Sequence, residues 1–184
     1  MDNLTPTEYA NKKVKKKNNQ SNFNAFLSSA KSTFGENPVV LAALAGNASV
    51  ESGGSFDPAQ KQIGGGGGRG VYQFDFHRKY YNKFLKDNNL NDDVNSQNKY
   101  VYENIYGDLK NIVGEGNAAK IREAFESGDP QEANEVFRTK FLRPGKPHAD
   151  RRAEKTDFYF EQMKDMFKKD EDEEDEDEDE TEEE

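Results

Sequence analysis

The segment 38–51, PVVLAALAGNASVE, constrains the fold of this chain more than any other stretch. Nearly every side chain over 39–45 is apolar, so a helix formed here is apolar on all sides and has to be buried by its neighbours. Asn37 followed by Pro38 is a typical helix start, and two glycines after the run are a typical stop. We therefore predict a central buried helix over 38–51.

Glu51 is the last residue of this predicted helix. It follows Asn47 by four residues and Leu44 by seven, which places it on or beside the buried face. The partial negative charge of a helix carboxyl end and desolvation by apolar neighbours both favour the protonated form of a carboxyl group. A protonated glutamate can serve as a general acid. The competing interpretation, common for an arbitrary glutamate, is a side chain that simply points to water.

Apolar residues recur at helical spacing in most of the remaining chain, which predicts a mainly α fold. Ser96 and Asp129 are expected to cap two of these helices, and Pro130 follows Asp129 as a first helical residue. Few segments alternate as strands do, so we expect at most a small β-hairpin near 55–74. Besides 38–51, the predicted helices cover residues 23–34, 75–87, 96–109, 117–127, 130–143 and 149–167.

The two ends differ in composition from the body, and we expect three parts: a disordered lysine-rich leader over 1–20, a domain over 21–168 and a disordered acidic tail over 169–184. The formal net charge of -10 comes from the tail, because residues 170–184 contain fourteen acids. The nearly neutral body argues against a nucleic-acid-binding core. No apolar run approaches the length of a membrane span, and we expect neither a signal peptide nor a membrane anchor.

Several chemistries can be excluded from the residues alone. The chain has no cysteine, its two histidines, His77 and His148, lie far apart, and no nucleophile-elbow motif occurs, so thiol, metal and serine-triad catalysis are not expected. The glycines of 64–68 are followed by no Lys-Ser/Thr pair and preceded by no predicted strand, which argues against a phosphate-binding loop. Acid catalysis by carboxylates, as in glycoside cleavage, is what remains.

The order of motifs around Glu51 resembles that of goose-type lysozymes and lytic transglycosylases, and is more specifically similar to the phage tail lysozyme family. GNASVESGGSFDP and, further on, GVYQFDFHR match the two main blocks of that family. SQNKYVYENI and VFRTKFLRPGKPHADRRAEKTDFY resemble its later segments, so the likeness spans about residues 34–163. An additional glycine in the turn after Glu51 and Phe74 in place of a common tryptophan depart from the pattern.

The resemblance implies cleavage of the β-1,4 bond between N-acetylmuramic acid and N-acetylglucosamine in bacterial peptidoglycan. Glu51 would protonate the glycosidic oxygen. Asp57 or Asp75 could act as a second carboxylate; alternatively none acts, and Glu51 returns as the base to form an anhydro sugar, as in lytic transglycosylases. No metal or cofactor is implied. The residues expected to contact the glycan are Ser52, Tyr72, Gln73, Phe74 and Arg78.

Two other functions stay open at this point. The chain could be a non-catalytic, lysozyme-like structural protein of a phage particle, docked to other virion proteins through the lysine leader and the acidic tail. It could also cleave chitin-like or soluble oligosaccharides with the same acid. For an enzyme, the expected location is the virion, acting on the host envelope, although an endolysin released through a pore fits the sequence equally well.

Overall fold

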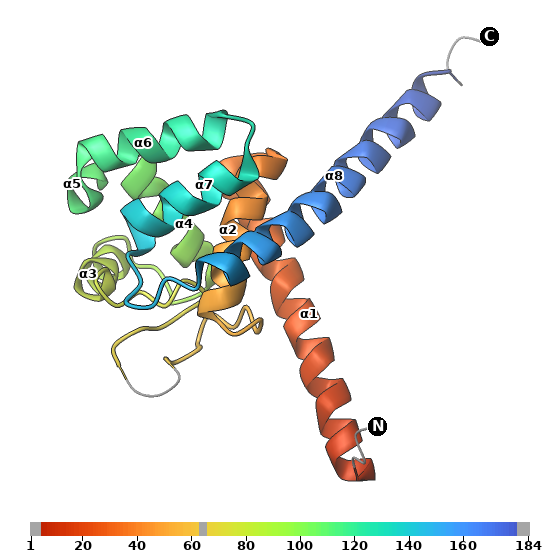
Figure 1. Ribbon diagram of the computed structural model, residues 1–184, viewed down its shortest axis with the longest axis horizontal. Coiled ribbons are helices and arrows are strands. Elements are labelled where there is room, and N and C mark those ends of the chain that lie inside the picture. The colour runs from red at the N-terminus through yellow and green to blue at the C-terminus, as the bar shows by residue number, and fades with distance from the viewer. Residues whose placement is uncertain (1–4, 63–65, 180–184) are drawn as a thin grey trace.

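A computed structural model describes residues 5–62 and 66–179 of the chain, and it confirms a mainly helical fold (Figure 1). The only strand pairing among the described residues is an isolated antiparallel bridge between Lys61 and Arg69, so the loop lobe holds no hairpin of regular strands. The elements, in chain order, are α1 Pro6–Phe34, α2 Pro38–Glu51, α3 Arg78–Asp87, α4 Val94–Ile105, α5 Lys110–Val113, α6 Glu115–Glu126, α7 Pro130–Phe137, the π-helical turn η1 Arg138–Leu142 and α8 Ala149–Asp179.

Helix α2 is the buried centre of the fold, as its composition predicts. Every residue from Val39 to Ser49 is buried. The Asn37 side chain caps the helix by accepting hydrogen bonds from the backbone N–H groups of Val39 (2.9 Å) and Val40. α8 and α7 make its most extensive contacts, and α1 also packs against it. Burial of an all-round apolar helix on several sides is the packing that its sequence requires.

The first and last helices extend further than the sequence suggested. α1 begins at Pro6 rather than near Ser21, and α8 continues to Asp179. The outer parts of α1 and α8 project from the body in different directions (Figure 1). The backbone is therefore helical in most of the expected leader and in part of the expected tail, while residues 1–4 and 180–184 lie outside the described residues. The division into leader, domain and tail stays a prediction.

Other helix boundaries follow local capping chemistry. Asp129 caps α7 by accepting from the N–H groups of Gln131 (2.8 Å) and Glu132, as expected. The prediction for Ser96 was wrong: Asp93 is the cap of α4 and accepts from the Ser96 N–H at 2.9 Å. The Asp93 carboxylate, three residues before Ser96, accepts from a free N–H group of the first turn, so the helix begins at Val94.

Candidate functional site

Glu51 forms an ion pair with Arg152 at the crossing of α2 and α8. Nη2 of Arg152 lies 2.7 Å from Oε1 of Glu51. The arginine side chain is 1% exposed and the glutamate side chain 17% exposed, so the pair is buried on the arginine side and open to solvent only at the carboxylate. The site therefore presents one partly accessible carboxyl group at the end of a buried helix.

Arg152 is itself fixed by further acceptors. Its Nη1 donates to the Asn47 side-chain oxygen at 2.9 Å, and its Nε donates to the Pro147 carbonyl at 2.8 Å. All three guanidinium nitrogens therefore have a partner, which satisfies the requirement for burying a charged group. The planar guanidinium is consequently held in one orientation.

Asn47 connects this arginine to a third helix. Its Nδ2 donates to the Asn134 side-chain oxygen at 2.7 Å and to the Ala43 carbonyl at 2.9 Å. Asn134 belongs to α7, and both asparagines are buried. A continuous polar network thus runs from α7 through α2 to α8 and ends at Glu51.

Gly46 permits the close approach of α8 on which this network depends. A Cβ atom added at Gly46 would lie 2.9 Å from both the Cα and the backbone nitrogen of Thr156. Thr156 is one helical turn after Arg152, so the contact at Gly46 sets how closely the arginine approaches Asn47 and Glu51. Three residues of the GNASVE segment therefore act together. Gly46 allows the helix crossing, Asn47 binds the arginine and Glu51 supplies the carboxylate.

The two candidate second carboxylates stand apart from this network. Asp57 closes a local turn, its Oδ1 accepting from the Ala59 N–H at 2.8 Å. Asp75 is exposed, and its backbone carbonyl accepts from the Arg78 N–H. Among the described residues, neither hydrogen-bonds to Glu51. The group that the structure brings to the glutamate is a cation, Arg152, which sequence reasoning did not single out.

Ser52, the next residue after the glutamate, is buried, at 2% exposure. Its hydroxyl accepts a hydrogen bond from the Phe56 N–H at 3.1 Å. Its backbone N–H donates to the Ala48 carbonyl at the helix end. In this conformation Ser52 shapes the turn that follows Glu51.

Tyr72 and Phe74, expected to line a glycan cleft, are instead core residues. Both are at most 2% exposed. The Tyr72 hydroxyl donates to Asn98 at 2.7 Å, and burial raises the pKa of Tyr72 well above its usual value. Phe74 packs against the rings of Tyr81 and Tyr100. The physical reason is the size of these rings: Tyr72 packs against α1 and α7, and Phe74 against α3, α4 and η1.

Gln73 is less buried than its two neighbours and has a strained backbone, with φ of 49°. Its Nε2 donates to the carbonyls of Gly70 (2.8 Å) and Gln60 (3.1 Å). Its Oε1 has no hydrogen-bond partner among the described residues. This oxygen is buried, so Gln73 does not offer it to a ligand in this conformation, and its contact with the glycan stays a prediction. Arg78, the remaining predicted contact, begins α3 and is half-buried.

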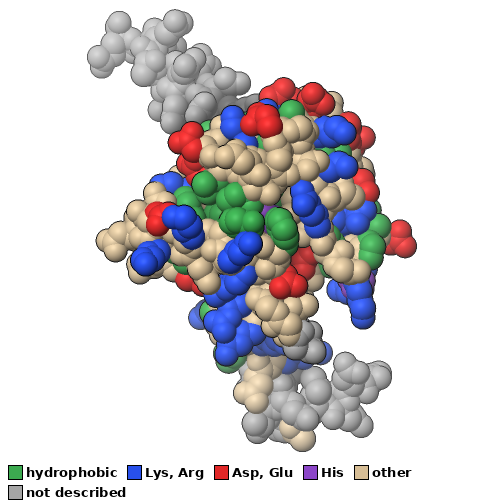
Figure 2. All heavy atoms as spheres, turned by 90° about the vertical axis from the view of Figure 1, so that its left-hand side faces the viewer, with side chains coloured by type: hydrophobic (Ala, Val, Ile, Leu, Met, Phe, Trp, Pro, Cys, Tyr) green, Lys and Arg blue, Asp and Glu red, His purple; other side chains and the backbone are tan. Residues whose placement is uncertain are grey.

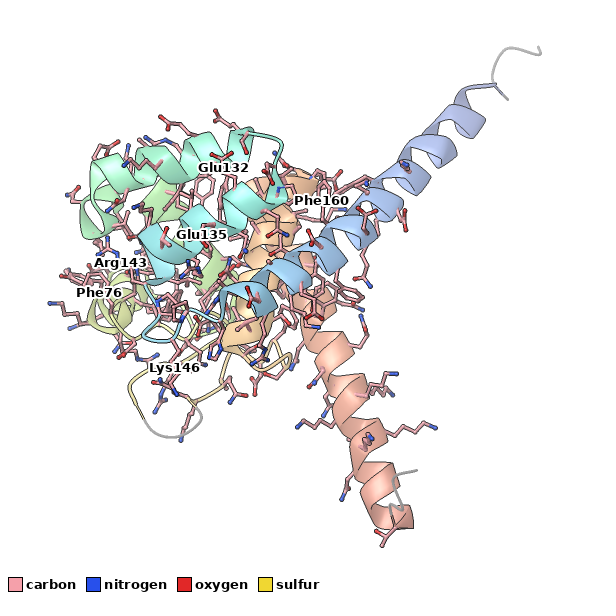
Figure 3. The ribbon with its side chains drawn as sticks, in the orientation of Figure 1. Phe76, Glu132, Glu135, Arg143, Lys146 and Phe160 are labelled. Atoms are coloured by element: carbon pink, nitrogen blue, oxygen red, sulfur yellow. The ribbon has the colours of Figure 1, made fainter. Side chains whose placement is uncertain are left out.

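The aromatic side chain of this region that does reach the surface is Phe76, at 48% exposure. The Arg143 guanidinium lies 5.3 Å from the centre of its ring, and the two side chains lie together beside α3 in Figure 3. On the same side of the molecule, Figure 2 shows hydrophobic side chains bordered by lysines and arginines. This surface was not foreseen from the sequence.

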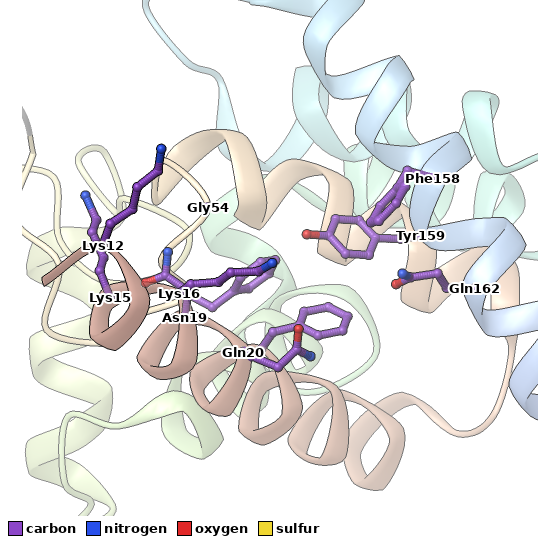
Figure 4. A pocket seen from close by; sticks show the side chains of 11 residues that line it. Lys12, Lys15, Lys16, Asn19, Gln20, Gly54, Phe158, Tyr159 and Gln162 are labelled. Carbon is purple, nitrogen blue, oxygen red and sulfur yellow. The ribbon is translucent and has the colours of Figure 1, made fainter. Parts of the chain in front are cut away.

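A hollow of about 550 Å³ lies between α1 and α8 (Figure 4). Phe23 and Tyr159 are among its aromatic residues, and lysines of α1 stand along it. Gly54, in the turn after α2, contributes to its rim. A second hollow follows α1 alone. Glu51 lines neither of them.

His77 is neutral and structural. Its ring is 2% exposed, bonded to the Tyr100 hydroxyl at 3.0 Å and the Phe141 carbonyl at 3.1 Å. Burial lowers the pKa of His77 from 6.5 to about 4. In the described part of the chain, no three His, Cys, Asp or Glu side chains are grouped as a metal site would need.

The helical fold, with a partly exposed glutamate at the end of its central buried helix, is consistent with a lysozyme-like domain. A family model described as phage tail lysozyme matches residues 17–163, and the chain belongs to this family. Membership points to a lysozyme-type function and to a phage-associated protein. No curated protein and no solved structure matches the chain. None of the described helices is long and apolar enough to cross a membrane.

Proposed function

We propose that this protein cleaves the β-1,4 bond between N-acetylmuramic acid and N-acetylglucosamine in bacterial peptidoglycan, with Glu51 as the general acid. The observation that carries the proposal is the partly exposed Glu51 carboxyl at the end of α2, fixed from behind by a buried arginine. Membership in the phage tail lysozyme family supports the same reaction. A virion-borne enzyme acting on the host wall is the setting that fits the family.

In the first step, the carboxyl proton of Glu51 passes to the glycosidic oxygen while the bond to the anomeric carbon breaks. The sugar then carries positive charge in an oxocarbenium-like transition state. Arg152 is a cation and does not stabilise positive charge on the sugar. It acts on Glu51, whose carboxyl group it binds. Gln73 and Arg78 remain the proposed glycan contacts among the residues that are not in the core.

Two second steps are compatible with this site. Water, activated by a carboxylate such as Asp57 or Asp75, can add to the sugar and give a reducing end. Alternatively, Glu51 can act as the base that draws the sugar's own hydroxyl onto the anomeric carbon and gives an anhydro product. The products distinguish the two routes, because only the second gives an anhydro sugar.

The test is digestion of purified peptidoglycan with mass analysis of the products. Wild type is expected to release muropeptides, and Glu51→Gln to lose at least a hundredfold in rate, since acid–base catalysis typically contributes about 10²–10⁴-fold. Melting temperature and circular dichroism serve as the folding control. Asp57→Asn and Asp75→Asn are assayed as separate single variants. Loss of activity in one of them identifies the second carboxylate. Release of muropeptides by folded Glu51→Gln at the wild-type rate contradicts the proposal.

A second candidate function is a lysozyme-like structural protein of a phage particle. The observation that favours it is the engagement of Glu51 in a buried ion pair, together with the position of the hollows beside α1 rather than at the glutamate. The same digestion separates the two candidates. A structural protein leaves peptidoglycan intact at every enzyme concentration, and its Glu51→Gln variant differs only in stability.

A further inference from the structure

We propose that Arg152 is the positioning residue of Glu51: it holds one carboxyl oxygen and so presents the other to the substrate. The inference rests on the proposed function, and it adds a residue from α8, which follows Glu51 by about a hundred positions in the chain. Arg152 does not touch the reacting sugar in this role. It acts through the glutamate.

The two oxygens of Glu51 are inequivalent. Oε1 accepts the Nη2–H group of Arg152 at 2.7 Å, whereas Oε2 has no hydrogen bond to the described residues. A guanidinium only donates hydrogen bonds and does not lose its proton at physiological pH. When the carboxyl group is protonated, Oε1 therefore remains the acceptor and the acid proton resides on Oε2. The proton is thereby directed away from the protein interior.

The arginine can fix this orientation because its own position is fixed. Its other two nitrogens are bound by Pro147 and Asn47, and Asn47 is held in turn by Asn134 of α7. An acid whose supporting groups are locked in this way needs little reorganisation to reach the glycosidic oxygen. Misplacement of a reacting group by about 1 Å can cost about a hundredfold in rate.

A buried ion pair could also serve stability alone, so the test must separate the two roles. Loss of a structural pair lowers the melting temperature and the folded fraction, but the folded molecules keep their turnover. Loss of a positioning residue lowers kcat of the folded molecules while KM changes little, because ground-state binding of the glycan does not depend on the orientation of the acid.

The experiment compares Arg152→Lys, Arg152→Met, Glu51→Gln and wild type on soluble, uncrosslinked glycan strands, with kcat and KM corrected for the folded fraction. Arg122→Met is the matched control, because Arg122 of α6 also pairs with a glutamate, Glu115, and donates to a backbone carbonyl, that of Ile105, but has no contact with this network among the described hydrogen bonds. We expect kcat of Arg152→Met to fall about 10–100-fold at a KM within about twofold of wild type.

Arg152→Lys keeps the positive charge and is the variant most compatible with folding. A lysine cannot reach Pro147, Asn47 and Glu51 together, so its kcat should lie between those of wild type and Arg152→Met. Wild-type kcat in folded Arg152→Lys overturns the inference, even where Arg152→Met does not fold. An inactive wild type or a fully active Glu51→Gln instead overturns the proposed function, and this inference falls with it. Arg122→Met should keep wild-type kcat.

Discussion

The two sequence blocks that resemble the family, residues 46–58 and 70–78, have different roles in the structure. In the first block, Gly46, Asn47 and Glu51 all face α8 and build the candidate site. In the second block, Tyr72 and Phe74 face inward and build the aromatic core. A recognisable motif therefore locates a region of the chain, but it does not say which of its side chains meet substrate. Small and polar residues of the first block are at the site, and large rings of the second support it.

The largest effect is expected at Gly46, where the first block touches α8. Gly46→Ala would bring a Cβ within 2.9 Å of the Thr156 backbone, which cannot rotate away as a side chain could. We expect a loss of at least about 3 kcal/mol in the free energy of unfolding, at the upper end for overpacking. Activity per folded molecule should also fall, because α8 carries Arg152. Chemical denaturation and the peptidoglycan assay measure the two effects.

Gly116→Ala is the matched control for that substitution. Gly116 lies in α6, and nothing stands within 4 Å of an added Cβ there. Alanine at such a position should stabilise the protein by about 0.5–1 kcal/mol and leave activity unchanged. If Gly46→Ala behaved like Gly116→Ala, the close crossing of α2 and α8 would not be what holds the site together.

Much of the fold was predictable because local chemistry and burial agree. The apolar run over 39–45, bounded by a helix start and a glycine stop, predicts a buried helix, and the Asn37-Pro38 and Asp129-Pro130 pairs mark helix starts that the structure confirms. The position of Glu51 at the end of α2 follows directly. α5 and the π-helical turn η1 were not predicted, since four or five residues carry too little periodicity to be recognised.

The partner of Glu51 was not predictable in the same way. On the last predicted helix, residues 149–167, helical spacing groups Ala149, Ala153, Thr156, Phe160, Met163 and Phe167 on one face. Thr156 and Met163 of this face are buried, whereas Ala149 is exposed. The same spacing leaves out Arg152 and Tyr159, which are buried as well. Hydrophobic periodicity places an arginine on the solvent side, because arginines are seldom fully buried unless paired. The pairing arises from a contact between positions about a hundred residues apart, which no local pattern contains.

His77 belongs to the second block and is hydrogen-bonded inside the core. Its pKa is lowered to about 4, so below pH 6.5 the unfolded chain binds a proton that the folded protein does not. The stability from a neutral His77 is complete above pH 6.5 and is lost as the pH falls towards 4. His77→Gln has no such difference in proton binding between the folded and unfolded states. We expect the variant to be less stable than wild type at pH 7.5, and this difference in the free energy of unfolding to shrink by about 2–3 kcal/mol at pH 4.5.

Denaturant unfolding of both proteins at the two pH values measures this change. Protonation of the acidic residues affects wild type and variant alike, so it cancels in the difference between them. A deficit that stays constant between pH 7.5 and pH 4.5 would mean that His77 is protonated within the fold. The second block would then hold a titrating group rather than a structural one.

The smallest effect is expected for Tyr72→Phe, which asks most directly whether the second block is core or site. The substitution removes the donor to Asn98 and leaves that buried oxygen unpaired, at a cost of about 1–2 kcal/mol. Tyr102→Phe is the control, because the Tyr102 hydroxyl has no hydrogen bond to the described residues, and it should cost close to nothing. Turnover and KM of folded Tyr72→Phe should match wild type. A raised KM at unchanged stability would instead mean that the Tyr72 hydroxyl meets the glycan, which requires the region between α1 and α4 to open when substrate binds.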